Sequence, residues 1–312
     1  MRKAILLYNP NSGRRRSRRV ADVNAALSVL HGGGVEAHAA QTRAASDATD
    51  QARQAIADGC DTVFACGGDG TIHDVLQGIV GTDTALGIIP LGTANSLAHD
   101  IRLPLSPKGA AQAYLTAKPR RIAVGRIEYQ DFSARRCSRY FTVTAGIGVD
   151  AHLFYRLNPL LKRHLGMAAY CVKATRLWLT HNMEKFAIEI PEDGQIRRAD
   201  VSQLLAVRIR YFGGVLRELA PGASLERDDL RMVLFHTRSR LRYLHYLMRG
   251  WFASEWKGQG IELVHRTDVT CTPLNTNSHP PSRIFVEADG ELLGTLPAQI
   301  TTVPDALTLL VP

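Results

Sequence analysis

The feature that most constrains the fold is an alternation of short apolar strands with amphipathic helices over roughly the first 120 residues. The expected strands and helices follow one another as Lys3–Tyr8, Ser17–His31, Val35–Ala39, Ser46–Asp58, Asp61–Cys66, Thr71–Val80, Ala85–Pro90 and Pro107–Ala117. Repeated strand–helix units imply a parallel sheet with helices on both faces. We therefore expect an α/β domain in this part of the chain.

The pattern changes after Arg121, where short strands separated by turns predominate. These are Arg121–Tyr129, Arg139–Ala145, Lys185–Ile190, Asp200–Ile209, Arg231–His236, Gly260–Val264, Asp268–Thr272, Ile284–Glu287 and Ile300–Val303, interrupted by one long expected helix at Leu160–Thr180. Many short strands are typical of an antiparallel β-sandwich. We place the domain boundary near Val124, giving domains 1–124 and 125–312, with a last strand that could return to the first domain.

The strongest chemical signal is the segment Cys66–His73, which follows a predicted strand and begins a predicted helix. Its glycines allow close backbone approach to a phosphate chain, and a helix N-terminus offers free N–H groups. A carboxylate here repels phosphate unless a cation intervenes, so Asp69 is a candidate to hold Mg²⁺ directly or through water. A tight glycine turn with Asp69 as a plain helix cap is the alternative.

Two more polar, glycine-bearing loops follow predicted strands. Asn9–Gly13 comes after the first strand, and Leu91–Asn95 comes after the strand Ala85–Pro90. Ligands of open parallel sheets bind beyond the carboxyl ends of the strands. Three such loops at one sheet edge favour a phosphate-binding site over three unrelated turns.

These segments resemble the diacylglycerol kinase catalytic-domain family, which includes bacterial lipid kinases and is related to sphingosine and ceramide kinases. The resemblance rests on six segments in the expected order, covering nearly the whole chain: Asn9–Gly13, Gly67–Thr71, Pro90–Asn95, Gly146–Ala151, Leu219–Ala223 and Asp289–Glu291. It implies an N-terminal ATP-binding domain of the NAD kinase and phosphofructokinase type, a C-terminal β-sandwich and an active site between them.

The same resemblance implies the cofactors ATP and Mg²⁺ and a set of nucleotide-binding residues. These are Asn9, Asn11, Gly13, Thr42, Gly67, Gly68, Asp69, Gly70, Thr71, Thr93 and Asn95. Glu291 matches the family's general base, and Asp69 is the second residue to which we assign a catalytic role. A base is needed because a lipid hydroxyl is a poor nucleophile. The Asp289–Glu291 segment also reads as a hairpin turn, which could itself present Glu291.

The segment Leu225–Leu230 resembles the family's structural magnesium loop. The resemblance implies that the carbonyls of Leu225 and Leu230 and the carboxylate of Asp228 bind the ion. Asp229 stands where the family usually has glycine, and a solvated acidic turn is the alternative interpretation.

Two other departures bear on activity, because the family commonly has aspartate where this chain has Ser96 and Ala123. In some members these carboxylates join a network around the first Asp, and Asp100 and Asp150 are candidates to compensate. The leading hypothesis is a lipid kinase acting on a diacylglycerol-like hydroxyl. The alternatives are a catalytically impaired lipid- or nucleotide-binding regulator and an NAD kinase-like enzyme.

Charge and composition suggest where such a protein would work. The formal net charge is +9, no run of apolar residues is long enough to span a membrane, and the five scattered cysteines form no C-x-x-C pair. We expect a cytoplasmic protein at the inner membrane face, with a lipid substrate and peripheral contact with anionic membrane. No nucleic-acid signature accompanies the charge, so we expect no nucleic-acid partner. A homodimer is left open.

The segment Arg238–Trp256 mixes arginines with aromatic residues and is predicted to be helical. It could dock on a bilayer. The spacing of Leu241, Leu244, Met248 and Trp251 instead favours a helix that packs these side chains against the sandwich.

Overall fold

The computed structural model describes residues 1–10, 18–43, 47–149, 183–192, 194–213, 218–249, 260–274 and 283–312. Several residues named above lie outside these ranges: Asn11, Gly13, Asp150, Trp251 and the expected helix Leu160–Thr180. Among the described residues, no helix is both long and apolar enough to cross a bilayer.

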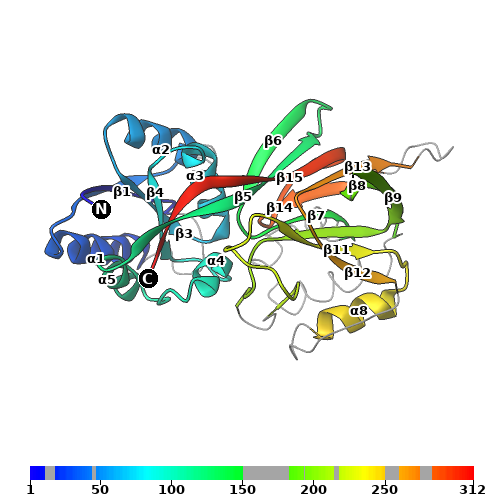
Figure 1. Ribbon diagram of the computed structural model, residues 1–312. Coiled ribbons are helices and arrows are strands. Elements are labelled where there is room, and N and C mark those ends of the chain that lie inside the picture. Colours follow the sequence, from blue (N-terminus) through cyan, green and yellow to red (C-terminus); the bar gives the residue numbers. More distant parts are fainter. Residues whose placement is uncertain are drawn as a thin grey trace.

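The first part of the chain is an α/β layer structure around a parallel sheet (Figure 1). Its strands are β1 (Lys3–Tyr8), β2 (Glu36–Gln41), β3 (Thr62–Gly67) and β4 (Ala85–Pro90), in the spatial order β4-β3-β1-β2. Every residue of β3 and β4 is buried, as expected for central parallel strands covered on both faces. The sequence-based expectation of a parallel sheet is confirmed.

Helices cover both faces of this sheet (Figure 1). They are α1 (Arg19–Gly32), α2 (Asp47–Ala57), α3 (Asp69–Ile79), α4 (Ser96–Asp100) and α5 (Pro107–Tyr114). Figure 1 shows α2 and α3 on one face and α1 and α5 on the other. The helices bury mainly alanine and aliphatic side chains. Helix α5 begins with a proline in its first turn and is capped by the Ser106 hydroxyl.

The second part is antiparallel. Its elements are β5 (Lys118–Gln130), β6 (Arg136–Phe141), β7 (Thr144–Gly148), β8 (Phe186–Glu192), β9 (Gln195–Val201), β10 (Gln203–Val207), β11 (Leu230–Phe235), α8 (Arg240–Arg249), β12 (Ile261–Arg266), β13 (Asp268–Pro273), β14 (Phe285–Ala288) and β15 (Glu291–Val311). One layer has the order β12-β11-β10-β7-β14, and the other has β6-β5-β15-β13-β8-β9. The two layers enclose a separate apolar core, which confirms the antiparallel β-sandwich.

The long strands β5 and β15 join the two parts (Figure 1). They pair antiparallel with each other, and Thr308 and Leu309 of β15 pair parallel with β4. β15 therefore extends the α/β sheet as well as the sandwich. Along β5, Val124 belongs to the first core and Ile127 to the second, so the core changes beside the boundary proposed near Val124.

Candidate active site

Two glycine loops meet beyond the carboxyl ends of β3 and β4. The Leu91 N–H donates to the Gly67 carbonyl (2.8 Å). A Cβ on Gly92 would lie 2.4 Å from Gly68 Cα, so the two backbones touch at a distance that only glycine permits. The sequence-based expectation that these loops converge corresponds to this direct contact.

Asn95 closes the second of these loops on itself. Its Oδ1 accepts from the Gly92 N–H (2.9 Å), and its Nδ2 donates to the Gly92 carbonyl (3.2 Å). The backbone of Asn95 is left-handed, with φ of 50°, which asparagine tolerates better than most residues. Asn95 thus shapes the loop, and Thr93 at its tip is exposed.

Asp69 is the first residue of α3, and its carboxylate joins the β3 loop to α4. Its Oδ1 accepts from the N–H of Ser96, the first residue of α4 (2.8 Å). Burial raises the pKa of the Asp69 carboxyl, the Ser96 N–H opposes this, and the negative charge of Asp289 adds to it. Ser96 therefore contacts Asp69 through its backbone, where the family's usual aspartate would bring a second carboxylate.

Glu291 lies against the first turn of α3. A Cβ on Gly70 would be 2.8 Å from Glu291 Oε1, so the carboxylate occupies the space that this glycine leaves open. Burial raises the pKa of the Glu291 carboxyl; His73 opposes the shift and Asp289 adds to it. Residues far apart in the sequence, Asp69–Gly70 and Glu291, thus meet at one helix N-terminus.

Asp289 builds the turn that presents Glu291, as expected from the sequence, and its carboxylate makes contacts that the sequence did not indicate. Its carboxylate accepts from the backbone N–H groups of Thr142 (3.1 Å), Val143 (2.9 Å) and Thr144 (3.1 Å). His73 Nδ1 lies 3.5 Å from Asp289 Oδ2, and both side chains are buried. The backbone of Asp289 has φ of 49°, and Gly290 follows it, consistent with the expected hairpin turn.

A further carboxylate near Glu291 was missed by the sequence analysis. Asp74 lies on α3 one turn beyond Gly70, so both residues lie on the same side of the helix. Burial raises the pKa of Asp74 to about 6; His73 and Arg139 oppose the shift, and the charge of Glu291 adds to it. The sequence does show that Asp74 lies four residues after Gly70 in a predicted helix. This spacing places Asp74 near the base only once it is known that Glu291 contacts Gly70.

The remaining nucleotide-binding candidates occupy the same sheet edge. Thr42 follows β2 and is buried, and its backbone N–H donates to the Tyr8 carbonyl (2.9 Å). Asn9 follows β1. The Thr71 side chain packs on Gly67, where an added Cβ would lie 2.1 Å from its hydroxyl oxygen. These residues are brought to one edge of the sheet, while their individual roles remain predictions.

Arg19 is a buried cation at this edge of the sheet. It is 2% exposed, and its Nη1 donates to the Leu91 carbonyl (2.9 Å). A cavity of about 360 Å³ lies beside it, lined also by Gly92, Thr93 and Asn95. Arg19 therefore holds the start of the second glycine loop, and the cavity lies beside the backbone of that loop.

Asp100 does not join Asp69, although it was a candidate to replace the missing carboxylates. Its Oδ1 accepts from the backbone N–H groups of Arg210 (2.9 Å) and Tyr211 (2.8 Å). It therefore fixes the segment after β10. Ala123 lies in β5 and is buried, and its carbonyl accepts from Arg208 Nη2 (2.9 Å).

The Leu225–Leu230 loop does not fit a magnesium ion. The Leu225 carbonyl faces the guanidinium of Arg208, whose Nη2 donates to it (3.4 Å), and Asp228 is exposed. The Asp229 carboxylate accepts from Arg227 and lies 3.0 Å from His265 Nδ1. A cationic side chain already occupies the carbonyl-lined interior of the loop.

The fold and the site together define a class: an α/β domain whose parallel sheet carries glycine loops at its carboxyl edge, joined to a sandwich that contributes a carboxylate. This is the fold of diacylglycerol kinases and NAD kinases. A Bacillus anthracis diacylglycerol kinase structure superposes with a TM-score of 0.70 at 18% identity, covering 100% of this chain and 97% of that one. Yeast NADH kinase, solved with NADH, superposes with a TM-score of 0.52 at 12% identity, covering 100% and 84%.

Sequence comparisons identify the family. The diacylglycerol kinase catalytic-domain family matches residues 3–127, and the YegS C-terminal NAD kinase beta sandwich-like domain matches residues 142–311. The diacylglycerol kinase of Mycobacterium tuberculosis is 31% identical over 312 residues, covering 99% of this chain and 95% of the relative. That of Bacillus subtilis is 27% identical over 307 residues, covering 97% and 94%. The chain belongs to the diacylglycerol kinase family, as its motifs indicated.

Proposed function

We propose that the protein is an ATP- and magnesium-dependent kinase that phosphorylates a hydroxyl of a diacylglycerol-like lipid, with Glu291 as general base. The observation that carries the proposal is the contact between Glu291 and the first turn of α3 at Gly70. Helix N-termini bind phosphate through free N–H groups and the helix dipole. The carboxylate therefore stands beside the surface on which a transferable phosphate would bind.

The environment of Glu291 suits proton abstraction. A base works best when its pKa approaches the working pH. Glu291 as a whole residue is exposed, but the loss of water around its carboxyl and the charge of Asp289 raise the pKa of that group. The turn that presents it is fixed by three backbone hydrogen bonds to Asp289. Glu291 can thus accept the lipid hydroxyl's proton from a held position while the phosphoryl group is transferred.

The glycine loops and Asp69 would hold the nucleotide. The first turn of α3 and the loop Gly92–Asn95 would form a cradle of backbone atoms around the contact between Gly68 and Gly92, and the Asp69 carboxylate lies beside it. When bound with ATP, Mg²⁺ would offset charge on the phosphate oxygens. No three His, Cys, Asp or Glu side chains of the described residues form a metal group on their own. We propose Asp69 as one ligand, direct or through water, to an ion that also binds the nucleotide's oxygens, because its carboxylate lies at the meeting point of α3 and α4 beside the glycine loops.

We further propose that α8 mediates contact with the anionic cytoplasmic face of the membrane. The helix exposes Leu241, Leu244 and Met248, with exposed fractions of 78%, 42% and 47%. Arginines lie on the same helix, and such a mixture of apolar and basic side chains suits a bilayer surface. The expectation that these three residues pack in the core was wrong: Tyr243 and Tyr246 are buried instead, and Tyr243 stacks on Phe235 with centroids 4.4 Å apart.

The first experiment is a transfer assay with labelled ATP, Mg²⁺ and micelles of diacylglycerol, monoacylglycerol, ceramide or sphingosine. We expect transfer to diacylglycerol or a close relative, and a loss of at least about 100-fold in kcat for Glu291→Gln, with ATP binding retained. Transfer to NAD alone would favour the NAD kinase-like alternative. ATP binding without transfer to any acceptor would favour the impaired regulator.

A further inference from the structure

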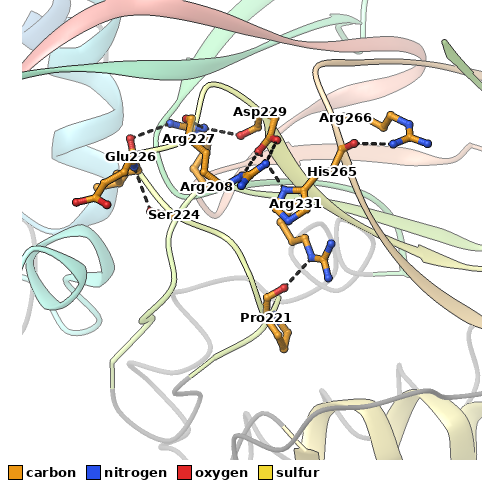
Figure 2. Close-up of polar contacts among 10 residues, drawn as sticks. Arg208, Pro221, Ser224, Glu226, Arg227, Asp229, Arg231, His265 and Arg266 are labelled. Carbon is orange, nitrogen blue, oxygen red and sulfur yellow. Dashed lines mark hydrogen bonds and ion pairs between the residues drawn. The ribbon is translucent and has the colours of Figure 1, made fainter. Parts of the chain in front are cut away.

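The loop Leu225–Leu230 is organised around one buried guanidinium. Arg208 follows β10 and is 0% exposed. Its Nη1 donates to the carbonyls of Arg227 (2.8 Å) and Asp229 (2.6 Å), and its Nη2 donates to those of Ala123 (2.9 Å) and Leu225 (3.4 Å). Figure 2 shows Arg208 directed at this loop. Four backbone oxygens thus converge on a single cation.

Such a set of oxygens is what a hard metal ion would otherwise use. Backbone carbonyls bind Ca²⁺ and Mg²⁺ because their oxygens carry partial negative charge. A guanidinium satisfies the same oxygens through a planar array of N–H donors, and it remains charged even when buried. Burial lowers the pKa of Arg208 to about 10, and the charges of Asp229 and Asp228 oppose this, so the side chain stays protonated at neutral pH.

The charges around the loop disfavour a second cation. Arg231, whose Nε donates to the Pro221 carbonyl (2.7 Å), also lies at this loop. The Asp229 carboxylate is engaged by Arg227 Nε (2.8 Å) and by His265, and Asp228 points to solvent. A divalent ion would be repelled by a buried positive charge at short range, and one of its implied carbonyl ligands, that of Leu225, already accepts from Arg208.

We propose that the Arg208 guanidinium takes the place of a structural metal ion in this protein, so that the loop is held without a divalent cation. The guanidinium also reaches beyond the loop, because it donates to the carbonyl of Ala123. Ala123 lies in β5, the strand that runs between the two parts of the chain. Arg208 is therefore a positioning residue that ties β10, the loop and β5 together. The inference does not depend on which acceptor the enzyme phosphorylates.

The test compares thermal unfolding of the nucleotide-free protein in EDTA, Mg²⁺ and Ca²⁺, with metal content measured after gel filtration. Asp69→Asn is run in parallel, so that an ion bound at the phosphate site does not contribute. We expect unchanged Tm values in that variant and no retained metal. A Tm shift in Asp69→Asn that disappears when Asp228→Asn is added, or one equivalent of retained metal, would overturn the proposal.

A second arm asks whether the guanidinium holds the loop. Arg208→Met should lower the Tm by about 5 to 10 °C, because it leaves buried carbonyls without donors. Arg231→Met, which removes a single carbonyl bond in the same region, is the matched control and should shift the Tm far less. If Arg208→Met does not fold, Arg208→Lys replaces it, since a lysine keeps the charge but cannot span the same carbonyls. A Tm for the Arg208 variant equal to that of the wild type would refute the proposal.

Discussion

Gly70 and Glu291 form a pair in which the absence of one side chain makes room for the other. In Gly70→Ala the new Cβ would lie 2.8 Å from Glu291 Oε1, so the carboxylate must move. We expect kcat to fall by about 10- to 100-fold with little change in the KM for ATP, because a small displacement of a base is costly. Gly32→Ala, where an added Cβ meets nothing within 4 Å, is the matched control and should leave both constants unchanged.

Asp74 is a residue whose charge should oppose folding at neutral pH. The pKa of its carboxyl is raised to about 6 from the ordinary 3.8, so ionisation costs more in the folded than in the unfolded chain. The folded state is favoured by the protonated form, and this contribution is lost as the pH rises from about 4 to about 6. Asp74→Asn should therefore raise the free energy of unfolding by about 1 to 2 kcal/mol at pH 7.5.

The measurement is chemical denaturation of both proteins at several pH values. The gain from Asp74→Asn should shrink as the pH falls from 6 to 4, where the wild-type carboxyl is protonated as well. An equal stability gain at every pH would show that packing, rather than charge, is responsible.

At the scale of single elements, α8 makes the clearest prediction. Replacing Leu241, Leu244 and Met248 by glutamine should lower binding to vesicles that contain anionic lipid by about 10-fold or more, since each removes exposed apolar contact area. The Tm should stay unchanged, because these side chains are not in the core. Unaltered vesicle binding would show that α8 does not contact the membrane. The matched control is replacement of Ile196, an exposed apolar residue on β9, by glutamine.

Elements with local signals were predicted from the sequence. The strands, the glycine loops and the turn before Glu291 are each encoded within a few neighbouring residues, as Gly67–Thr71 illustrates. The buried face of α8 was not predicted, because Leu241, Leu244 and Met248 fit helical spacing as well as Tyr243 and Tyr246 do. Which face of α8 is buried depends on Phe235 of β11, whose ring packs against both tyrosines.

The contacts of Asp74, Asp289 and Arg208 were beyond sequence reasoning for the same reason. Each meets partners remote in the sequence, such as the backbone of Thr142–Thr144 for Asp289. The sequence of Leu225–Leu230 does resemble a magnesium loop. It could not reveal that Arg208, outside the pattern, places its own charge among those carbonyls.

At the scale of the whole molecule, β15 makes the two parts interdependent. Residues 1–124, the first of the two domains we propose, would lack the strand that pairs with β4, leaving the edge of a fully buried strand exposed. Uncovered apolar strand edges promote aggregation. We expect the 1–124 fragment to be insoluble or loosely packed, as measured by near-UV circular dichroism and gel filtration. The full chain should unfold in one calorimetric transition, and a compact, monomeric fragment would contradict this.

The position of β15 also bears on how the protein matures in the cell. Because β15 follows every other described element in the chain, the ribosome makes it last, after β1 to β4 have already emerged. Synthesis at about 5 to 20 residues per second leaves β4 without its neighbour for several seconds at least. Glu291 arrives with the same strand. The nascent chain therefore acquires its proposed base and the completed sheet together, so chaperone protection of the β4 edge would be needed most just before that moment.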